Sequence, residues 1–537
     1  MKITSILGRS LSALALAMGA STVAHAAVPV INTDQGAAQG LASAGVSRFL
    51  GLPFAAPPVG ALRWKAPQAP APWSGVRDAT QFANVCPQEP SAFSGRSETE
   101  DCLYLNVYRP DNSTGQPLPV MVWLHGGGYV LGAGSNYDGA PLARQAKAVV
   151  VTVNYRLGIF GFMALPGLQA ENPAANYGIQ DQQAALRWVK QHASRLGGDP
   201  NRITLFGQSA GGNSACLHLL SPPSAGLFNG AISQSGPCVL LRNVPLSDVR
   251  EKSEAVAQSL GCPAGAQQLA CMRQQSTVAL MNATPPNLDI IYSKPPWVPA
   301  IDGVILPDAA DKLLQSGRVN KVPVMFGNDH DEGRLFVALT FHLGQQRGVT
   351  AADHSLAMKG MVGTTLAPLF TDVLYSPSRY GSYDKALAAA VTDNFYACSA
   401  LSDVKTLSGL TKAYAFEFND PNAPGAAPDP YFTWDAYHSS ELAYLFQGET
   451  PSPVFTPAQQ TLADQLVKYW AHFAAKGDPN GPGLPQWRRF DRLSAPVQDL
   501  APGAVTTKDW GHFERDHQCG VWATVHALKK LSAGIDE

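Results

Sequence analysis

Long hydrophobic runs and an excess of one charge are both missing from this 537-residue sequence. A membrane-spanning helix needs about 18 uninterrupted apolar residues, and no stretch after the N-terminal segment reaches that length. The 39 Lys and Arg residues nearly balance the 41 Asp and Glu residues, and neither kind forms a long run. We therefore expect neither a nucleic acid nor a membrane as a partner.

Repeats and linkers are also lacking. The chain has no repeat period and no long Gly/Ser-rich or Pro-rich linker, although about 510 residues could form several ordinary domains. Its 49 Gly and 42 Pro residues are scattered, as expected for many tight turns between elements. The sequence favours one large domain over residues 27–537 and leaves the oligomeric state open.

The N-terminal segment, residues 1–26, has the features of a signal peptide. Lys2 and Arg9 give a basic start, residues 11–23 form an apolar stretch, and residues 24–26 (AHA) match the small-residue cleavage pattern. We expect cleavage after Ala26 and an exported protein, either periplasmic or secreted from the cell.

Eight cysteines in an exported chain predict a set of disulfides. Sequence alone does not choose the pairing. Cys216 and Cys238 each lie in an apolar segment of a predicted core element, and we expect both to be buried free thiols.

Short apolar segments rich in β-formers alternate with helical patterns, which predicts an α/β fold. Strands so apolar on both faces are typical of a mostly parallel sheet covered by helices. Residues 180–196 have apolar positions at helical spacing and predict one of these helices. The predicted strands cover residues 119–124, 149–154, 203–206, 231–233, 322–326 and 413–418.

The strand at 203–206 runs into Gly207-Gln208-Ser209-Ala210-Gly211, followed by a helical pattern. This is the GxSxG motif in a strand, turn and helix context, where a sharp turn exposes a nucleophilic serine. Glycines allow the backbone to turn this tightly. The alternative, a glycine-rich turn without chemistry, is less consistent with this context, so Ser209 is the predicted nucleophile.

The strand at 119–124 ends in residues 125–128 (HGGG), a loop type that supplies oxyanion-hole amides in esterases. We expect the N–H groups of Gly127, Gly128 and Ala210 to face the developing oxyanion. A phosphate-binding loop is excluded because no GK[ST] follows. His125 is expected to be structural.

The orienting acid and the base should follow the serine in that chain order. Residues 327–333 (GNDHDEG) follow a predicted strand and offer Asp329, Asp331 and Glu332. The spacing does not match a calcium loop, and a solvated turn is the alternative for the two aspartates. One of the three carboxylates is expected to orient the base, and the residues alone leave the choice open.

His438 is the predicted base, because it lies in a loop downstream of the strand at 413–418. No HExxH motif occurs, and His512 and His517 lack the spacing that places two imidazoles on one helix face. We therefore expect no metal and no cofactor.

Taken together, the ordered motifs resemble the type-B carboxylesterase family, which includes cholinesterases, animal carboxylesterases and bacterial para-nitrobenzyl esterases. The resemblance covers nearly all of the mature chain and implies an α/β-hydrolase fold with a large, mostly parallel central sheet and helices on both faces. The matching segments include GLPFAAPPVGALRWKAP, EDCLYLNVYRP, VWLHGGGY, VNYRLGIFGF, GGDPNRITLFGQSAGG, GNDHDEG and YHSSEL.

The resemblance implies more than the residues alone do. It selects Glu332 as the acid and adds Ser235 as a serine near the histidine. It also implies two structural ion pairs and three disulfides: Arg63 with Glu100, Arg156 with Asp181, Cys86–Cys102, Cys262–Cys271 and Cys398–Cys519.

The expected reaction is hydrolysis of neutral apolar or aromatic carboxylic esters through an acyl-enzyme intermediate. Cholinesterases hold a quaternary ammonium group against a tryptophan in the loop closed by the first disulfide. Here that loop has Phe93 and no tryptophan, so a choline ester is not the expected preference. Two alternatives are an amidase or carbamate hydrolase using the same triad and a non-catalytic cholinesterase-like binding module.

Overall fold

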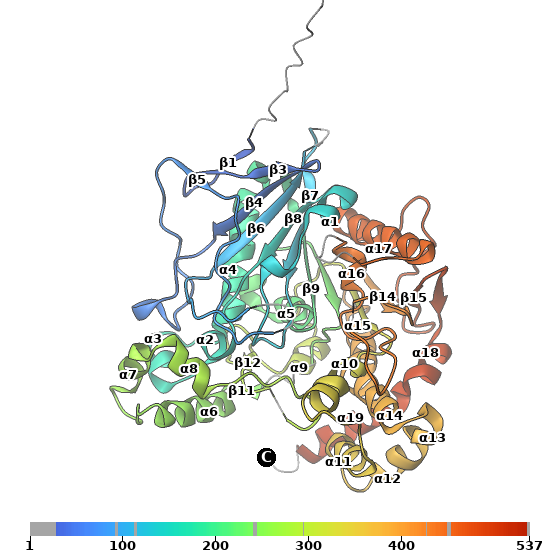
Figure 1. The fold of residues 1–537 in the computed structure, drawn as a ribbon. Coiled ribbons are helices and arrows are strands. Elements are labelled where there is room, and N and C mark those ends of the chain that lie inside the picture. The colour runs from blue at the N-terminus through green and yellow to red at the C-terminus, as the bar shows by residue number, and fades with distance from the viewer. Residues whose placement is uncertain are drawn as a thin grey trace, which may run out of the picture.

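A sheet of 11 strands forms the centre of the described chain (Figure 1). The computed structural model describes residues 28–91, 95–111, 115–239, 244–293, 295–425, 427–447 and 453–533, so the predicted signal peptide lies outside these ranges. In spatial order the strands are β16 (Ala504–Lys508), β15 (Val497–Ala501), β14 (Ala413–Phe418), β13 (Val324–Asp329), β10 (Gly230–Gln234), β9 (Gly198–Gln208), β7 (Leu118–Leu124), β8 (Val149–Val153), β6 (Tyr104–Pro110), β4 (Val46–Pro53) and β3 (Leu41–Ser43).

The middle of the sheet is parallel and both edges are antiparallel. Every neighbouring pair from β15 to β8 is parallel. The outer pairs, β15–β16, β6–β8, β4–β6 and β3–β4, are antiparallel. The parallel part contains all six strands predicted from apolar segments, and the prediction of a mostly parallel sheet is confirmed.

Side chains alternate between two cores, one on each face of the sheet. In β7, Val120, Val122 and Leu124 point into one core, whereas Met121 and Trp123 point into the other. The first core includes α4 (Tyr177–His192), α5 (Ala210–Leu220) and α15 (Cys398–Leu407). The second includes α1 (Ala140–Ala146), α16 (Leu442–Leu445) and α17 (Pro457–Lys476). Helices therefore cover both faces, as predicted.

Local sequence signals set the ends of these helices. Thr456 and Gln459 form a reciprocal capping box at the start of α17, with Pro457 at its first position, and Gly477 ends the helix with φ 66°. The helix predicted at 180–196 is α4, which continues as a 3-10 turn over Ala193–Leu196 and ends at Gly197 with φ 80°.

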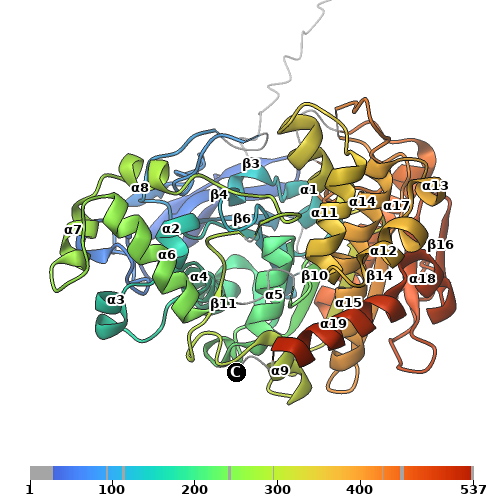
Figure 2. The same cartoon turned by 90° about the horizontal axis from the view of Figure 1, so that it is seen from below.

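The remaining elements surround this framework. Figure 2 shows α6 to α8 gathered at one end and α11 to α14 with α18 and α19 at the other. The other helices are α2 (Gly158–Phe162), α3 (Pro166–Glu171), α6 (Leu246–Ser259), α7 (Gln268–Gln274), α8 (Thr277–Ala283), α9 (Ala310–Gln315), α10 (Gly333–Val337), α11 (Ala351–Val362), α12 (Ala367–Leu369), α13 (Pro377–Tyr380), α14 (Tyr383–Val391), α18 (Trp510–His517) and α19 (Cys519–Ala533). Two small sheets contain β1 (Val30–Asn32), β2 (Ala37–Gln39) and β5 (Val76–Asp78), and β11 (Val244–Pro245) with β12 (Ala300–Ile301).

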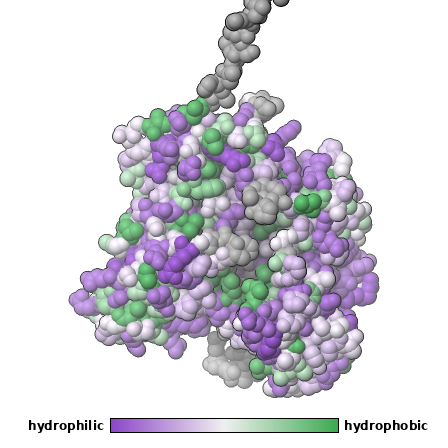
Figure 3. Space-filling model, viewed as in Figure 1, coloured by the Kyte–Doolittle hydropathy of each residue, from purple (hydrophilic) through white to green (hydrophobic). Residues whose placement is uncertain are grey.

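Hydrophobic and hydrophilic residues are interspersed on the face shown in Figure 3. Most large apolar side chains of the described chain lie in the two cores. Within the described ranges, no helix combines the length and the apolar character needed to cross a lipid bilayer.

Four disulfides cross-link the structure, and one of them corrects the expectation of free thiols. The bonds Cys86–Cys102, Cys262–Cys271 and Cys398–Cys519 are those that the family resemblance implies. Cys216 of α5 and Cys238, which follows β10, are also bonded to each other, with 5.2 Å between their Cα atoms. Both sites are buried as expected, but α5 lies directly against the end of β10 and brings the two sulfurs together.

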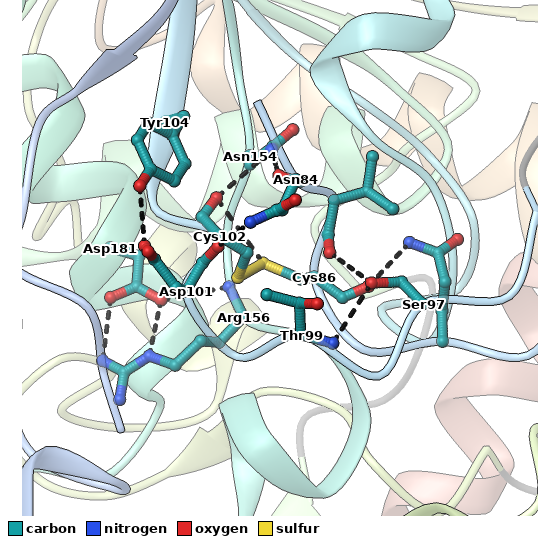
Figure 4. The surroundings of a disulfide bond; sticks show 12 residues. Asn84, Cys86, Ser97, Thr99, Asp101, Cys102, Tyr104, Asn154, Arg156 and Asp181 are labelled. Atoms are coloured by element: carbon teal, nitrogen blue, oxygen red, sulfur yellow. Dashed lines mark hydrogen bonds and ion pairs between the residues drawn. A yellow bond between two sulfur atoms is a disulfide. The ribbon is translucent and has the colours of Figure 1, made fainter. Parts of the chain in front are cut away.

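The two ion pairs implied by the resemblance are present. Arg63 pairs with Glu100 through two guanidinium nitrogens, and Arg156 binds Asp181 with two contacts of 2.8 Å. Figure 4 shows the second pair close to the Cys86–Cys102 bond. Because each pair is bidentate and buried, removing one partner would leave an uncompensated charge in the interior.

Candidate active site

Ser209 lies on a sharp turn between β9 and α5. Its φ is 56° and its ψ is −124°, a conformation that a non-glycine residue adopts only under strain. The surrounding backbone holds the turn, because the Ser209 N–H donates to Gln234 O at 2.9 Å and the Ser209 carbonyl accepts from Asn213 N at 2.8 Å. This is the geometry of a nucleophile elbow.

The glycines that flank Ser209 are required by close contact with the end of β7. A Cβ at Gly211 would lie 2.0 Å from Leu124 O, and one at Gly207 would lie 2.5 Å from the Gly211 backbone. No side chain fits at either position. The two glycines therefore allow the turn that contains Ser209 to pack directly against β7, in addition to allowing the chain to turn sharply.

The glycine loop after β7 lies beside Ser209. A Cβ at Gly126 would be 3.0 Å from the Ser209 Cβ. Gly127 and Gly128 have φ values of 106° and 61°, and in the described part of the chain their N–H groups have no hydrogen-bond acceptor. Gln88, in the Cys86–Cys102 loop, binds the N–H and the carbonyl of Gly132 and so anchors the far end of this segment.

His125 is structural in this geometry, as the sequence predicts. Its Nδ1–H donates to Gly126 O at 2.8 Å and its ring stacks on Tyr155 with 4.3 Å between centroids. Burial lowers the pKa of His125 to about 4. The imidazole is therefore neutral at physiological pH and supports the glycine loop.

The structure brings Glu332 and His438 into direct contact. His438 Nδ1 donates to Glu332 Oε2, and the other carboxylate oxygen, Oε1, accepts from Asp329 N at 2.9 Å. Both side chains are buried. A backbone hydrogen bond of 2.8 Å from Asp331 N to Ala436 O connects the loop that contains His438 to the 327–333 segment that contains Glu332.

The other two carboxylates of the 327–333 segment have different surroundings. Asp331 pairs with Arg334 at 3.2 Å and with His330 at 3.0 Å, away from His438. Asp329 is fully buried, so the alternative of a solvated turn is wrong for this residue. Of the three candidates, Glu332 alone contacts the His438 ring nitrogen among the described residues.

Gln208 is a site residue that the sequence analysis did not identify. Its Nε2 donates to His438 Nε2 at 3.2 Å, and among the described residues no hydrogen bond joins His438 to the Ser209 hydroxyl. The side chains of Phe336 and Tyr396 flank the imidazole with ring centroids 5.0 and 5.1 Å away. The only available signal for Gln208 was its place as the second residue of GxSxG.

Ser235 follows β10, between the strands that carry Ser209 and Glu332. It has φ 50°, its N–H donates to Gly327 O at 2.7 Å, and its Oγ has no hydrogen-bond partner in the described structure. No hydrogen bond joins Ser235 to His438 among the described residues, so the expected role of Ser235 beside the histidine stays a prediction.

A second cluster of titratable groups lies at the carboxyl end of β14. His330, Glu417 and His517 place ligand-type atoms within 4.8 Å of one another. His517 donates to Asp393 at 2.7 Å and to Glu417 at 2.6 Å, and Lys508 lies 2.7 Å from Glu417. Burial opposes the charge of His517, but Glu417 and Asp393 outweigh burial and raise its pKa to about 10. A metal ligand must be a neutral imidazole, so the geometry favours an ion-pair network.

The order of the elements, with a serine after β9, a carboxylate after β13 and a histidine after β14, is that of the serine hydrolases of the α/β-hydrolase fold. The carboxylesterase family model matches residues 27–522. The chain belongs to the carboxylesterase family, and it is a carboxylic ester hydrolase.

Curated relatives and solved structures agree with this assignment. The acylcarnitine hydrolase of Mus musculus is 35% identical over 509 residues, which cover 88% of this chain and 88% of the relative. The cocaine esterase of Homo sapiens is 35% identical over 506 residues, covering 90% and 87%. A thermophilic PNB esterase has a TM-score of 0.77 at 30% identity and covers 91% of this chain and 99% of its own. Because these relatives are named as a hydrolase and esterases, they do not favour the alternative of a non-catalytic binding module for this chain.

Proposed function

We propose that Ser209, His438 and Glu332 are the nucleophile, the general base and the orienting acid of the ester hydrolase. His438 Nε2 accepts the Ser209 hydroxyl proton as Oγ attacks the ester carbonyl carbon, and the N–H groups of Gly127, Gly128 and Ala210 stabilise the oxyanion. The protonated imidazole then gives its proton to the departing alcohol. Water, deprotonated by His438, then attacks the acyl-enzyme, and His438 returns that proton to Ser209 Oγ as the carboxylic acid leaves.

The observation that carries this proposal is the contact from Glu332 Oε2 to His438 Nδ1. This contact keeps the proton on Nδ1, so the lone pair of Nε2 points away from the acid. Gln208 already donates a hydrogen bond to that lone pair and immediately precedes Ser209. The Ser209 hydroxyl replaces the Gln208 amide when the base is used.

The site supports a preference for neutral apolar or aromatic esters. Phe336 and Tyr396 flank the base with aromatic rings. Leu288 Cδ2 lies 2.7 Å from where a Cβ at Gly128 would stand, so an apolar side chain covers the glycine loop. The Cys86–Cys102 loop contains no tryptophan for a cationic substrate; its Phe93 lies outside the described residues.

The test is a comparison of kcat/KM for three substrates with one acyl chain: an uncharged thioester, the matching thiocholine ester and the matching anilide. We expect the uncharged thioester to be preferred. A desolvated cation–π contact is worth about 2 kcal/mol, or roughly thirtyfold. A tenfold preference for the choline ester would contradict the substrate class, and a preference for the anilide would favour an amidase.

We also propose that residues 1–26 are removed after Ala26 and that residues 27–537 form a single domain exported to the periplasm or the medium. Four disulfides are typical of an extracytoplasmic compartment. Intact-mass measurement of the exported protein tests the cleavage site. Limited proteolysis tests the domain, because a separable domain would be released as a stable fragment.

A further inference from the structure

Two more carboxyl groups are buried behind the His438–Glu332 pair. Asp329 is the last residue of β13 and Glu441 immediately precedes α16, and their exposed fractions are 0% and 1%. Within the described chain, no Lys or Arg forms an ion pair with Asp329, Glu441 or Glu332. Three carboxyl groups therefore interact with one another, and His438 is a group that can carry a positive charge beside Glu332 and Glu441.

The hydrogen bonds around these groups leave carboxyl oxygens of both Asp329 and Glu441 unsatisfied. Glu441 Oε1 accepts from Gln234 Nε2 at 2.8 Å, but Glu441 Oε2 and both carboxyl oxygens of Asp329 have no side-chain donor among the described residues. The Ser439 backbone N–H acts on Asp329 and favours its carboxylate form. The two carboxyl groups are nevertheless in hydrogen-bonding contact with each other. Two ionised carboxylates cannot share such a contact, whereas a carboxylic acid and a carboxylate can.

We propose that Asp329 and Glu441 share one proton, and that this O–H···O bond positions His438 by fastening its loop to the end of β13. The proposal rests on the proposed function of His438. Asp329 is the better proton carrier because Glu441 already accepts a hydrogen bond from Gln234, which favours its ionised form. Asp329 and Glu441 are positioning residues, since neither lies in contact with the Ser209 hydroxyl.

The electrostatics of the pocket support the shared proton. Burial raises the pKa of Asp329 well above its ordinary range, and the charges of Glu441 and Glu332 add to this effect; the Ser439 N–H opposes it. Burial also raises the pKa of Glu441, whereas the hydrogen bonds from Asp329 and Gln234 lower it. The other charged or titratable groups that face Glu441 are Glu332, which raises its pKa further, and His438, which favours the carboxylate.

The shared proton closes a continuous hydrogen-bonded path across the strand ends. Trp470 Nε1 donates to Gln234 Oε1 at 3.0 Å, Gln234 Nε2 donates to Glu441, and Gln234 O accepts the Ser209 N–H. Asp329 N in turn donates to Glu332 Oε1 at 2.9 Å. Loss of the proton at alkaline pH would place two carboxylates against each other beneath the His438 loop, so activity should fall there.

The test compares Asp329→Asn with Asp329→Ala, and uses Asp331→Asn as the matched control from the same segment. Asparagine retains an N–H donor toward Glu441 but cannot titrate. We expect Asp329→Asn to keep kcat within about threefold and to extend the alkaline limb of the kcat profile to higher pH. Asp329→Ala should lose about tenfold or more, as expected when a buried acceptor loses its donor. Asp331→Asn should leave the alkaline limb unchanged.

Infrared difference spectroscopy gives a readout that does not depend on activity. The wild-type enzyme and the inactive Ser209→Ala variant should both show the C=O stretch of a buried carboxylic acid at neutral pH, and Asp329→Asn should lack it. An unchanged band together with an unchanged alkaline limb in Asp329→Asn would overturn the proposal, even if Ser209 is confirmed as the nucleophile. A missing band in the Ser209→Ala protein would also overturn it. If Ser209→Ala stays active, the triad assignment fails and the infrared result still stands.

Discussion

Replacement of Glu332 by glutamine should invert the hydrogen bond that orients His438. In the native structure, Glu332 Oε1 accepts from Asp329 N, and Oε2 accepts from His438 Nδ1. An amide has one acceptor and one donor end. The backbone N–H of Asp329 needs the acceptor, so the NH₂ group must face His438 and force the imidazole proton onto Nε2.

The wrong tautomer cannot accept the Ser209 proton, because Nε2 then carries its own. Disruption of the equivalent hydrogen bond in serine hydrolases costs about 10⁴ in rate, or about 5 kcal/mol of transition-state stabilisation. We expect Glu332→Gln to lose about this factor in kcat/KM while the fold is retained, since the side-chain volume is almost unchanged and the bond to Asp329 N is preserved.

The assay is kcat/KM with a para-nitrophenyl ester for Glu332→Gln and for Asp331→Asn, with circular dichroism as the check on folding. Asp331 differs in its surroundings, since it pairs with Arg334 and His330. Its variant should retain most of the activity. A larger loss in Asp331→Asn than in Glu332→Gln, with both proteins folded, would refute the reasoning.

Three further predictions concern the nucleophile, a disulfide and pH. Ser209→Ala should lose about 10⁶ in kcat with the fold intact; a folded variant that retains a few per cent of wild-type turnover would contradict the assignment. Loss of Cys398–Cys519, which closes a loop of 121 residues, should lower the unfolding free energy by about 5 kcal/mol in the chain-entropy model. Loss of Cys262–Cys271, which closes only 9 residues, should lower it by about 2.6 kcal/mol. Urea unfolding of the two variants, each with both cysteines of one disulfide replaced by serine, measures the difference. Folded His517 keeps its proton up to pH about 10, whereas unfolded His517 loses it near pH about 6.5, so unfolding free energy should decrease as pH rises through this window and His517→Gln should lack that decrease.

The parallel centre of the sheet was predictable because its strands are apolar on both faces. Residues 119–124 and 149–154, for example, correspond to β7 and β8 almost residue for residue. The antiparallel edge was not predicted. Strands β3 and β16 have largely exposed side chains, so they lack a continuous apolar segment, and their pairing is set by contacts with the rest of the sheet.

The site was only partly predictable, and the limit was distance along the chain. Motif context predicted Ser209, but spacing alone did not separate the adjacent Asp331 and Glu332, and only the family resemblance selected Glu332. The physical reason is visible in the structure, where Asp331 is paired with Arg334 and His330. Burial alone likewise could not distinguish a free thiol from a disulfide at Cys216. The pairing of Asp329 with Glu441 joins residues from separate elements, and no local pattern reports it.

His438 is held mainly by contacts with the 327–333 segment that contains Glu332, and less by contacts with the turn that contains Ser209. Its loop is bound to the acid segment through Asp331 N and Ala436 O, and its ring is bound to Glu332. The contact with Gln208 at 3.2 Å is longer and involves a side chain that can rotate. Under the proposed mechanism, we therefore expect the Ser209 hydroxyl to replace the Gln208 amide at Nε2 without movement of the imidazole, so that His438 keeps its tautomer and orientation when the serine attacks.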